Sequence, residues 1–578
     1  MKINDVEKIT GLSRKAIRLY ESKGLISVSR DENTYRNYSS EDVEKLKKIK
    51  LLRSIGAPIA DIKLYLFNVM SLDELMDKRK SEILKESGKN SEKYRICESI
   101  LNNTDYSLKS IDDFNENETE GRKSYGSLSV GIDIGTTTVS AAIYDIDNKE
   151  QIEAYTIPHN SYVKSGDFTE QSISIIMEKS EKLLYHILNS YENIISIGIS
   201  GQMHGIAYID KNGKALSNLI NWQDKRADQK LTDNQTACEQ ILGITGEIIH
   251  TGYGIATHYY NMLNNLVPSD AVTFLSIMDI FAMKICGLKK PIIHSSVAAS
   301  FGLFDLKKCQ FMTEKLSLLN INEDFLPTVT SESIIIGEFK DIPVSIPLGD
   351  NQASFLGSVK DKDTLLINIG TGSQISSISD YRQVSDEIEL RPLIEGKYLI
   401  CASALCGGYA YSMLESFFRS YAVSLGIDES SQYKIINQLA MEAYEKEERG
   451  LLVDTSFLGK RGNPNIRGSI KMIDSQSFTP SNLALGFLKG ICNELYELYS
   501  LFPIKHNYAV ASGGAVKKNK LLKILLADTF EISVSDNTLN EEAATGVSLF
   551  SAFAIGKINF NNGFGEYIKG DDYNAASN

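Results

Sequence analysis

Two short segments of this chain repeat one pattern of residues that can hold a phosphate group. The first is Ile132-Asp133-Ile134-Gly135-Thr136-Thr137-Thr138, and the second is Ile367-Asn368-Ile369-Gly370-Thr371-Gly372-Ser373. Each follows an apolar run and precedes an alternating one, which predicts a strand, a tight turn and a second strand. Glycine lets the backbone approach an anion, and hydroxyl and turn N–H groups can donate to it. Two facing hairpins would clamp a nucleotide; two unrelated hairpins with the same turn chemistry are the alternative.

Two carboxylates are candidates for chemistry on a bound phosphate, of which phosphoryl transfer is one kind. That reaction requires alignment, charge neutralisation and a group that takes the proton of the acceptor. Asp350, in Gly349-Asp350-Asn351-Gln352-Ala353, follows an apolar run at the expected start of a helix and can act as this base. Asp133, in the first hairpin, is suited to Mg²⁺ through water, because Mg²⁺ keeps most of its hydration shell. As alternatives, Asp350 caps the helix and Asp133 caps the turn.

The composition fits a soluble, intracellular protein of several domains. The length of 578 residues predicts about three to four domains, and 42% hydrophobic residues are enough for several cores. The seven cysteines are scattered and form no C-x-x-C pair, which favours reduced thiols over a disulfide framework or a zinc site. The N-terminus lacks a signal-peptide core and no run of 18 apolar residues occurs. We therefore expect a cytoplasmic protein with no membrane partner.

The first 56 residues form a basic head on an acidic chain. They carry 13 Lys and Arg against 8 Asp and Glu, whereas the whole chain has a net charge of −13. This asymmetry favours a polyanion as the partner of the head. Residues 3–9 and 13–22 predict two short helices joined at Thr10-Gly11-Leu12, with Ser13 as the cap of the second. This is the spacing of a helix-turn-helix.

Residues 1–100 resemble the MerR family of transcription regulators. The resemblance rests on the second helix, the wing-like Tyr35-Arg36-Asn37-Tyr38 and the turn Leu52-Arg53-Ser54-Ile55-Gly56. It implies a winged helix-turn-helix that distorts double-stranded promoter DNA as a homodimer, paired through a long helix for which residues 72–101 are the candidate. A protein-binding helical module is the alternative. The residues predicted to form the DNA-binding face are Ser13, Arg14, Lys15, Arg18, Tyr20, Tyr35, Arg36 and Tyr38.

From residue 128 onward, strand and helix patterns alternate, and four motifs follow in order. Besides the first hairpin and the Asp350 motif, these are Ser200-Gly201-Gln202-Met203-His204-Gly205 and Ser512-Gly513-Gly514 with Asn519. Together they resemble the FGGY carbohydrate kinases over about residues 128–557. The resemblance implies an α/β fold of the actin-like ATPase architecture, with two lobes, ribonuclease H-like cores, and ATP and Mg²⁺ as cofactors.

The resemblance also assigns site residues. It makes Asp350 the catalytic base and Asp133 the organiser of Mg²⁺. The residues it implies for ATP are Gly135, Thr136, Thr137, Gly370, Thr371, Gly372, Gly513, Gly514 and Asn519. Those expected to line the sugar site are Gln202, Met203, His204, Trp222, Asp224, Arg226 and Asn351. An ordinary core position is the alternative for both His204 and Trp222.

Gln-Met-His favours a ketose as the acceptor. Glu389-Leu390-Arg391-Pro392-Leu393 and Cys406-Gly407-Gly408-Tyr409-Ala410-Tyr411 are most similar to sedoheptulokinases, with xylulokinases as the nearest competitor. We predict a DNA-binding domain at 1–70, a dimerisation helix at 71–103, a linker at 104–127, an N-terminal lobe with the sugar site at 128–356, a C-terminal lobe with the nucleotide site at 357–560, and a tail at 561–578. Three hypotheses remain: a DNA-binding kinase, a non-catalytic sugar sensor, and an enzyme whose head only dimerises it.

Overall fold

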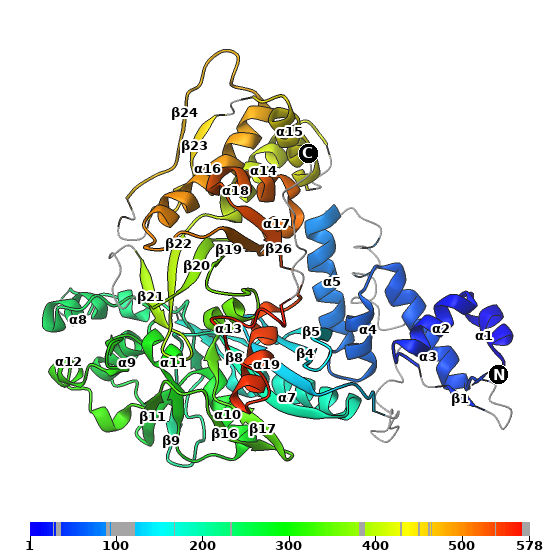
Figure 1. Cartoon of the computed structure of the whole chain (residues 1–578), viewed down its shortest axis with the longest axis horizontal. Coiled ribbons are helices and arrows are strands. Elements are labelled where there is room, and N and C mark those ends of the chain that lie inside the picture. Colours follow the sequence, from blue (N-terminus) through cyan, green and yellow to red (C-terminus); the bar gives the residue numbers. More distant parts are fainter. Residues whose placement is uncertain are drawn as a thin grey trace.

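The structure is a computed structural model of the chain, drawn in Figure 1. It describes residues 1–26, 28–30, 36–87, 93, 97, 122–166, 168–231, 234–380, 388–427, 431–448, 451–460, 463, 465–537 and 539–568. A helical head lies to the side of two α/β lobes. This arrangement confirms the predicted fold class, a winged helix-turn-helix followed by two lobes.

The head folds as a winged helix-turn-helix. Ser13 caps the second helix by accepting a hydrogen bond from the backbone N–H of Ala16, and Gly11 ends the first helix with a φ of 64°. The short strands of the wing pair antiparallel, with Arg30 opposite Arg36. The elements are α1 (Ile3–Thr10), α2 (Arg14–Ser22), β1 (Ser29–Arg30), β2 (Arg36–Asn37), α3 (Ser40–Ser54), α4 (Ile59–Leu66) and α5 (Leu72–Ser87).

The helix predicted for dimerisation is α5, which ends at Ser87. Most of 88–103, and of the linker at 104–127, lies outside the described residues. Leu75, Met76 and Ile83 are at most 1% exposed in this single chain, and Arg79 donates to the carbonyl of Ile55 at 2.9 Å. These three apolar side chains of α5 are therefore already buried without a partner, whereas Leu84 is 42% exposed, and pairing of two chains stays a prediction.

The N-terminal lobe is built on a seven-stranded sheet with the order β16-β17-β8-β3-β4-β5, with β18 also beside β8. β3 and β4 form an antiparallel hairpin, and β3 runs parallel to β8. Burial on both faces explains why β3 is apolar along most of its length. The strands are β3 (Leu128–Ile134), β4 (Thr138–Asp145), β5 (Glu150–Pro158), β8 (Ile194–Gly201), β16 (Ile335–Phe339), β17 (Ile342–Ser345) and β18 (Leu348–Gly349).

The C-terminal lobe repeats this topology in a sheet with the order β21-β22-β20-β19-β25-β26. Again an antiparallel hairpin, β19–β20, is followed by a parallel neighbour, β25. The two glycine-threonine segments thus occupy the same position in two related sheets, as their similarity predicted. The strands are β19 (Thr364–Ile369), β20 (Ser373–Ser379), β21 (Glu389–Pro392), β22 (Tyr398–Ala404), β25 (Tyr508–Ser512) and β26 (Ser533–Asp536).

The remaining elements cover these sheets or form the outer part of each lobe. In the N-terminal lobe they are β6 (Tyr162–Ser165), β7 (Phe168–Gln171), α7 (Ile173–Ser190), β9 (Ala207–Asp210), β10 (Leu219–Ile220), α8 (Ala237–Thr245), α9 (Gly254–Leu263), β11 (Ala271–Leu275), α10 (Ile277–Cys286), β12 (Ile292–His294), α11 (Ser295–Ser300), β13 (Phe304–Asp305), β14 (Gln310–Phe311), α12 (Thr313–Leu318) and β15 (Thr328–Thr330). In the C-terminal lobe they are α14 (Gly408–Ser424), α15 (Tyr433–Glu445), β23 (Leu452–Asp454), β24 (Ser469–Lys471), α16 (Pro480–Ser500), α17 (Gly514–Lys518) and α18 (Lys520–Phe530). Over the described residues, no helix combines the length and the apolar character that a bilayer requires.

Two helices connect the lobes, α13 (Asp350–Leu356) and α19 (Glu542–Ala554). α19 follows the C-lobe strands in sequence but packs on β3, β8 and α13. The contacts are backbone to backbone: a Cβ on Gly131 would lie 1.7 Å from the carbonyl oxygen of Ala544, and one on Gly546 would lie 1.8 Å from that of Ala353. The predicted division at 356/357 therefore separates two helices that pack together, and the domain boundaries stay predictions.

The head lies against the N-terminal lobe through α4 and α5, next to β5 (Figure 1). Lys63 of α4 is only 2% exposed, and its amino group lies 3.2 Å from Tyr155 Oη and 3.3 Å from Glu153 Oε2. Lys78 of α5 donates to the backbone carbonyl of Thr156 at 3.0 Å. The head is thus docked on the lobe by buried polar contacts.

Candidate active site and DNA-binding face

The first glycine-threonine turn is held by side chains from its surroundings. Gln171 Nε2 donates to the carbonyl of Thr136 at 2.7 Å, and Gln202 Nε2 donates to that of Gly135 at 3.4 Å. His159 Nε2 lies 3.2 Å from the same Gly135 oxygen. Because these carbonyls are engaged inside the protein, the turn is fixed in one conformation. Thr137 is exposed, so its hydroxyl can meet a ligand.

The two carboxylates predicted for chemistry are neighbours. Ser200 Oγ donates to Asp133 Oδ1 at 2.7 Å. Asp350 is the first residue of α13, and the cap of that helix is Gly349, so the alternative role of Asp350 as a cap is not realised. Burial raises the pKa of Asp350 to about 7, and the negative charge of Asp133 adds to this rise. Burial likewise raises the pKa of Asp133 to about 6, against the hydrogen bond from Ser200.

A magnesium ion fits this pair only if phosphate and water supply most of its ligands. Within the described residues, no cluster of three or more His, Cys, Asp or Glu side chains is arranged to hold a metal. Mg²⁺ commonly binds one or two carboxylates and completes its shell with waters and substrate phosphates. The two carboxylates of Asp133 and Asp350 agree with this mode of binding. The role of Asp133 in orienting Mg²⁺ through water stands as a proposal.

The second turn, Gly370 to Gly372, is joined to the start of α14. The N–H of Gly408 donates to the carbonyl of Gly370 at 2.8 Å, and the N–H of Gly407 donates to that of Thr371 at 2.9 Å. The predicted phosphate-binding turn is therefore fixed against the N-terminal end of a long helix, whose first N–H groups are engaged by the turn itself.

The third predicted nucleotide segment follows β25. Gly513 precedes α17 with a φ of 93°, and Gly514 begins that helix. Asn519 instead caps α18: its Oδ1 accepts from the N–H groups of Leu521 and Leu522 at 3.1 and 3.3 Å. Its Nδ2 donates to Asn437 at 3.0 Å. The amide of Asn519 is thus engaged inside the protein, and direct contact with adenosine stays a prediction.

The Gln-Met-His segment lies next to Asp350. Gln202 is 1% exposed, and among the described residues its Oε1 is buried without a hydrogen-bond partner. Met203 packs on Gly349, the residue before Asp350, where a Cβ would lie 2.1 Å from its sulfur. His204 has a φ of 73°, which is uncommon for a residue other than glycine and is found at functional sites.

His204 is held by residues that follow it by about 50 to 100 positions in the sequence. Its ring stacks on Tyr253 with the centroids 4.4 Å apart, and its Nδ1 lies 2.7 Å from the carbonyl oxygen of Ser300. Because one ring nitrogen and one ring face are engaged, the orientation of the imidazole is fixed before a ligand binds.

Trp222 is 45% exposed, so it is not an ordinary core tryptophan. Its Nε1 donates to Thr136 Oγ1 at 3.0 Å. This bond links Trp222, which is predicted to line the sugar site, to the first glycine-threonine turn. Its exposed ring can cover the C–H face of a sugar.

Asp224 and Arg226 require a correction, because the structure does not bring them to a surface that a sugar can reach. Asp224 is 0% exposed and Arg226 3%. Arg226 bonds to Asp224 and Glu170, both at 2.8 Å. A buried guanidinium needs such partners, so these residues support the loop that carries Trp222 and do not bind hydroxyls directly.

Several contributing residues were not predicted from the sequence. Gln171 and His159 hold the first turn, Ser200 holds Asp133, and Ser300 holds His204. Only Ser200 lies inside a recognised motif, so its position was a usable signal. The others come from distant strands and helices and have no local signature. Asn351, predicted for the sugar, follows Asp350 and accepts a weak bond from Cys401 Sγ at 3.6 Å.

The predicted DNA-binding face includes a basic surface. Arg14, Lys15 and Arg18 are exposed on α2. Arg14 Nε lies 2.8 Å from Glu7 Oε2, and Arg36 Nε lies 2.7 Å from Glu21 Oε2. Contact of these arginines with DNA phosphates stays a prediction.

Tyr20 and Tyr38 require a second correction. They are 7% and 1% exposed and lie in the core of the head. They do not present a DNA-contacting surface. Tyr35 lies outside the described residues.

Comparison with known proteins agrees with this geometry. Residues 1–68 match the model of the MerR HTH family of regulatory proteins, and residues 128–357 match that of the N-terminal domain of the FGGY family of carbohydrate kinases. The chain joins a MerR head to an FGGY kinase. Mouse sedoheptulokinase is 23% identical over 73% of this chain and 96% of its own length. Xylulose kinase of Staphylococcus xylosus is 24% identical over 73% and 90%.

A solved structure similar to this FGGY kinase is gluconate kinase from Lactobacillus acidophilus. It superimposes with a TM-score of 0.66 at 21% identity, over 77% of this chain and 93% of its own. At this identity the likeness establishes the fold, and the names of the three relatives point to three different acceptors.

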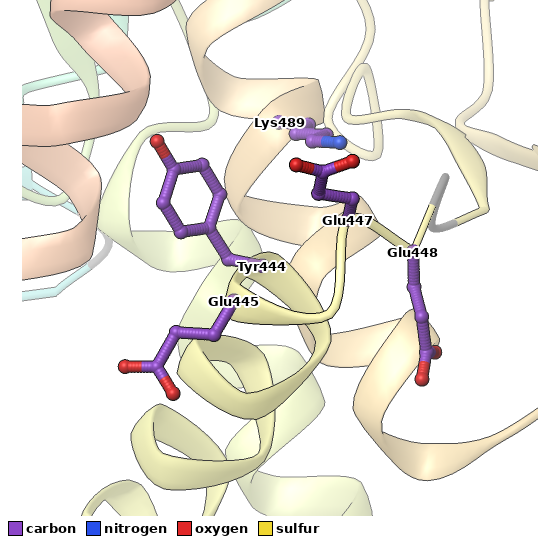
Figure 2. A pocket seen from close by; sticks show the side chains of 5 residues that line it. All are labelled: Tyr444, Glu445, Glu447, Glu448 and Lys489. Carbon is purple, nitrogen blue, oxygen red and sulfur yellow. The ribbon is translucent and has the colours of Figure 1, made fainter.

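Two hollows of this kinase lie apart from the predicted site residues. One, of about 610 Å³, is formed by the end of α15 and by α16; Figure 2 shows Lys489 and Glu447 turned toward each other there, with Glu445 and Glu448 directed away. The other, of about 750 Å³, lies beside the start of α7 and the end of α10. Neither contains Asp133 or Asp350, so neither bears on phosphoryl transfer.

Replacing Asp350 with asparagine should stabilise the protein at high pH. The pKa of about 7 in the folded chain exceeds the usual ~3.9 of an unfolded aspartate. The folded state therefore binds the extra proton, and stability from this group is lost as the pH rises from about 4 to about 7. We expect the Asp350→Asn variant to have a Tm higher than the native chain by roughly 2–4 °C at pH 8 and a similar Tm at pH 4.5.

Thermal unfolding at both pH values checks this expectation. Asp270→Asn, at an exposed position, is the control and should change neither Tm. A variant at Asp350 that is less stable than the native chain at pH 8 would contradict the burial of an unfavourable charge.

Proposed function

We propose that this protein uses ATP to phosphorylate a terminal hydroxyl of a ketose, and that its head binds double-stranded promoter DNA, most simply as a homodimer. The observation that carries the kinase proposal is the pairing of Asp350 with Asp133 beside the Gln-Met-His segment. Burial and the neighbouring charge raise the pKa of Asp350 to about 7, which is where a general base works best near neutral pH.

The proposed reaction assigns one task to each group of residues. The acceptor oxygen attacks the γ-phosphorus, its proton passes to Asp350, and the bond from that phosphorus to the bridging oxygen of ADP breaks. The turn at Gly135 and Thr136 and the turn at Gly370 to Gly372 hold the phosphates, and Asp133 orients Mg²⁺ through water. The ion, when bound, neutralises charge on the phosphates. Trp222 and His204 position the sugar.

Sedoheptulose is the acceptor we favour. The Glu389-Leu390-Arg391-Pro392-Leu393 stretch and the similarity to mouse sedoheptulokinase support it, whereas the similarity to xylulose kinase supports xylulose. ADP release with Mg-ATP and sedoheptulose, xylulose, ribulose, fructose, gluconate or glycerol tests the proposal. Strong turnover of one ketose supports it and names the substrate. No turnover with any of them overturns it.

A sugar sensor without catalysis is the second candidate. It is favoured by the docking of the DNA-binding head on the kinase lobe, which a plain enzyme does not need. The presence of both Asp133 and Asp350 weighs against it, since a sensor requires neither. Ligand-induced thermal stabilisation without turnover would distinguish the sensor.

The Asp350→Asn variant should lose ketose-dependent ADP release by ~10²–10⁴-fold, because its amide cannot take the proton. The native kcat/KM should fall below about pH 7, where Asp350 of the free protein becomes protonated. Steady-state rates between pH 5.5 and 9 measure both effects, with nucleotide binding by calorimetry as the control. Turnover near the native level in this variant removes Asp350 from the role of base.

The double variant Arg14→Ala, Arg18→Ala should weaken DNA binding and reduce its dependence on salt. Removing one side chain that neutralises a phosphate lowers the slope of log K against log salt by roughly 1. Fluorescence anisotropy with a duplex from the promoter region, at four salt concentrations, measures this slope. Lys211→Ala, an exposed change on the kinase, is the control. An unaltered slope in the double variant would exclude α2 as the DNA-binding face.

A further inference from the structure

The C-terminal lobe presents an arginine toward the start of α13. Glu389 and Arg391 lie on the same face of β21, because side chains alternate along a strand. Cys401 of β22 is paired with Glu389 and points to that face too. Its Sγ lies 3.6 Å from Asn351 Oδ1. This face of the hairpin is therefore directed at Asp350, the neighbour of Asn351.

Only part of the guanidinium of Arg391 is hydrogen-bonded within the protein. Its Nε donates to Glu389 Oε2 at 3.0 Å, and its Nη2 bonds the same oxygen. In the part of the chain that the structure describes, Nη1 makes no hydrogen bond, although the side chain is only 16% exposed. Nη1 is not among the enclosed polar atoms that lack a partner, so its N–H groups can be reached by a ligand. The free edge of this guanidinium thus indicates a ligand that accepts hydrogen bonds.

The position of β21 indicates which ligand this is. β21 contacts α11, and Ser300, the last residue of α11, fixes His204. The hairpin also reaches the N-terminal lobe through Gln352, whose Nε2 donates to the carbonyl of Pro392 at 3.0 Å. Burial and the charge of Asp133 raise the pKa of Asp350, whereas the positive charge of Arg391 lowers it. This effect agrees with a guanidinium near the carboxylate. The hairpin that carries Arg391 therefore contacts both α11 and α13, the helices next to His204 and Asp350.

We propose that Arg391 is a sugar-binding residue of the C-terminal lobe, which donates hydrogen bonds from Nη1 to hydroxyls of the acceptor held at Asp350. This inference rests on the proposed function. His204 and Trp222 hold the acceptor from one lobe and Arg391 from the other. An acceptor lacking a hydroxyl at that place leaves the guanidinium unpaired, so Arg391 discriminates between ketoses.

Kinetics of three variants test this role. Loss of a hydrogen bond from a charged group should raise the KM for the favoured ketose ~10–100-fold in Arg391→Met, with the KM for ATP changed less than about twofold. Arg391→Lys should recover part of the loss, because it keeps the charge but not the planar fork. Arg419→Met, which removes an arginine paired with Glu415 on α14, should behave as the native chain.

The outcomes separate this inference from the proposed function. A native chain that turns over no ketose overturns the proposed function itself. A native chain that is active, with an unchanged ketose KM and ranking in Arg391→Met, overturns only the role of Arg391. A shift of the acidic limb of the pH–rate profile without any change in KM would also overturn it, because Arg391 would then only adjust Asp350.

A separate observation concerns the contact between the head and the kinase. Lys78 of α5 donates to the carbonyl of Thr156 on β5. The hydroxyl of the same Thr156 donates to Glu541 Oε1 at 2.5 Å. Glu541 precedes α19 with a φ of 55°. Burial is the main reason that the pKa of Asp133 is raised, and the negative charge of Glu541 adds to this rise. One residue of β5 thus contacts both the head and the surroundings of the nucleotide site.

We propose that Thr156 couples occupancy of the nucleotide site to the docking of the head. Glu541 is the group that responds to a nucleotide, because it accepts from the Thr156 hydroxyl, to which Ser140, the residue paired with Asp133 across β3 and β4, donates at 3.3 Å. A displacement of Glu541 is passed through Thr156 to Lys78. The nucleotide site and the head are coupled only if both change the same contact, here the one at Thr156. A variant that removes the Thr156 hydroxyl must therefore remove the response of the head to nucleotide.

Hydrogen–deuterium exchange in the full chain tests the coupling. Mg²⁺ with a non-hydrolysable ATP analogue should change exchange in residues 59–87 of the native chain. Thr156→Val keeps the strand and its carbonyl but loses the hydroxyl, and should reduce this change at least twofold while the analogue still binds. Thr328→Val, on an exposed strand position, is the control. An equal response in Thr156→Val, or none in the native chain, overturns the proposal.

Discussion

The close contact of α19 with β3 and α13 is the constraint on which the active site depends. At Gly131 and Gly546 a side chain would collide with the backbone of the facing element, at 1.7 and 1.8 Å. The helix therefore approaches the sheet as closely as backbone atoms allow. Asp133 lies two residues after Gly131, and α13, which begins with Asp350, lies against the same helix. Packing density at this junction thus fixes the distance between the two carboxylates.

Burial and the proximity of Asp133 raise the pKa of Asp350, which suits a general base. Two carboxylates in a site with little water ionise less readily than either would alone. The protein gives up stability to keep both acids there, as is common where function conflicts with packing. A cation changes this balance, because Mg²⁺ near Asp133 or a guanidinium near Asp350 favours the charged forms. The state with bound nucleotide and sugar is therefore the one in which these carboxylates are compensated.

Much of this arrangement could be predicted from sequence, because the signals are local. The repeated Gly-Thr hairpins, Ser13 as a helix cap and Asp350 after an apolar run are patterns of neighbouring residues. The sequence did not predict which polar and aromatic side chains are buried. Tyr20, Tyr38, Asp224 and Arg226 have types that suit binding, yet each is enclosed by elements distant in sequence. Gln171 and Ser300 were missed for the same reason, since their partners lie 35 and 96 residues away. No periodicity records such contacts.

The fusion itself changes what a DNA-binding head can do. In this chain Leu75, Met76 and Ile83 of α5 are covered within the same molecule, whereas Leu84 is 42% exposed. The polar residues Lys78 and Glu74 contact β5 and α7. Glu74 pairs with Lys179 of α7 at 2.5 Å, and the ring of Phe67 lies 5.0 Å from that of His186. A second copy that paired along this face would have to displace the kinase lobe from it. Any dimer must therefore use another surface, or form at the expense of docking, and in either case the position of the lobe enters the geometry presented to DNA.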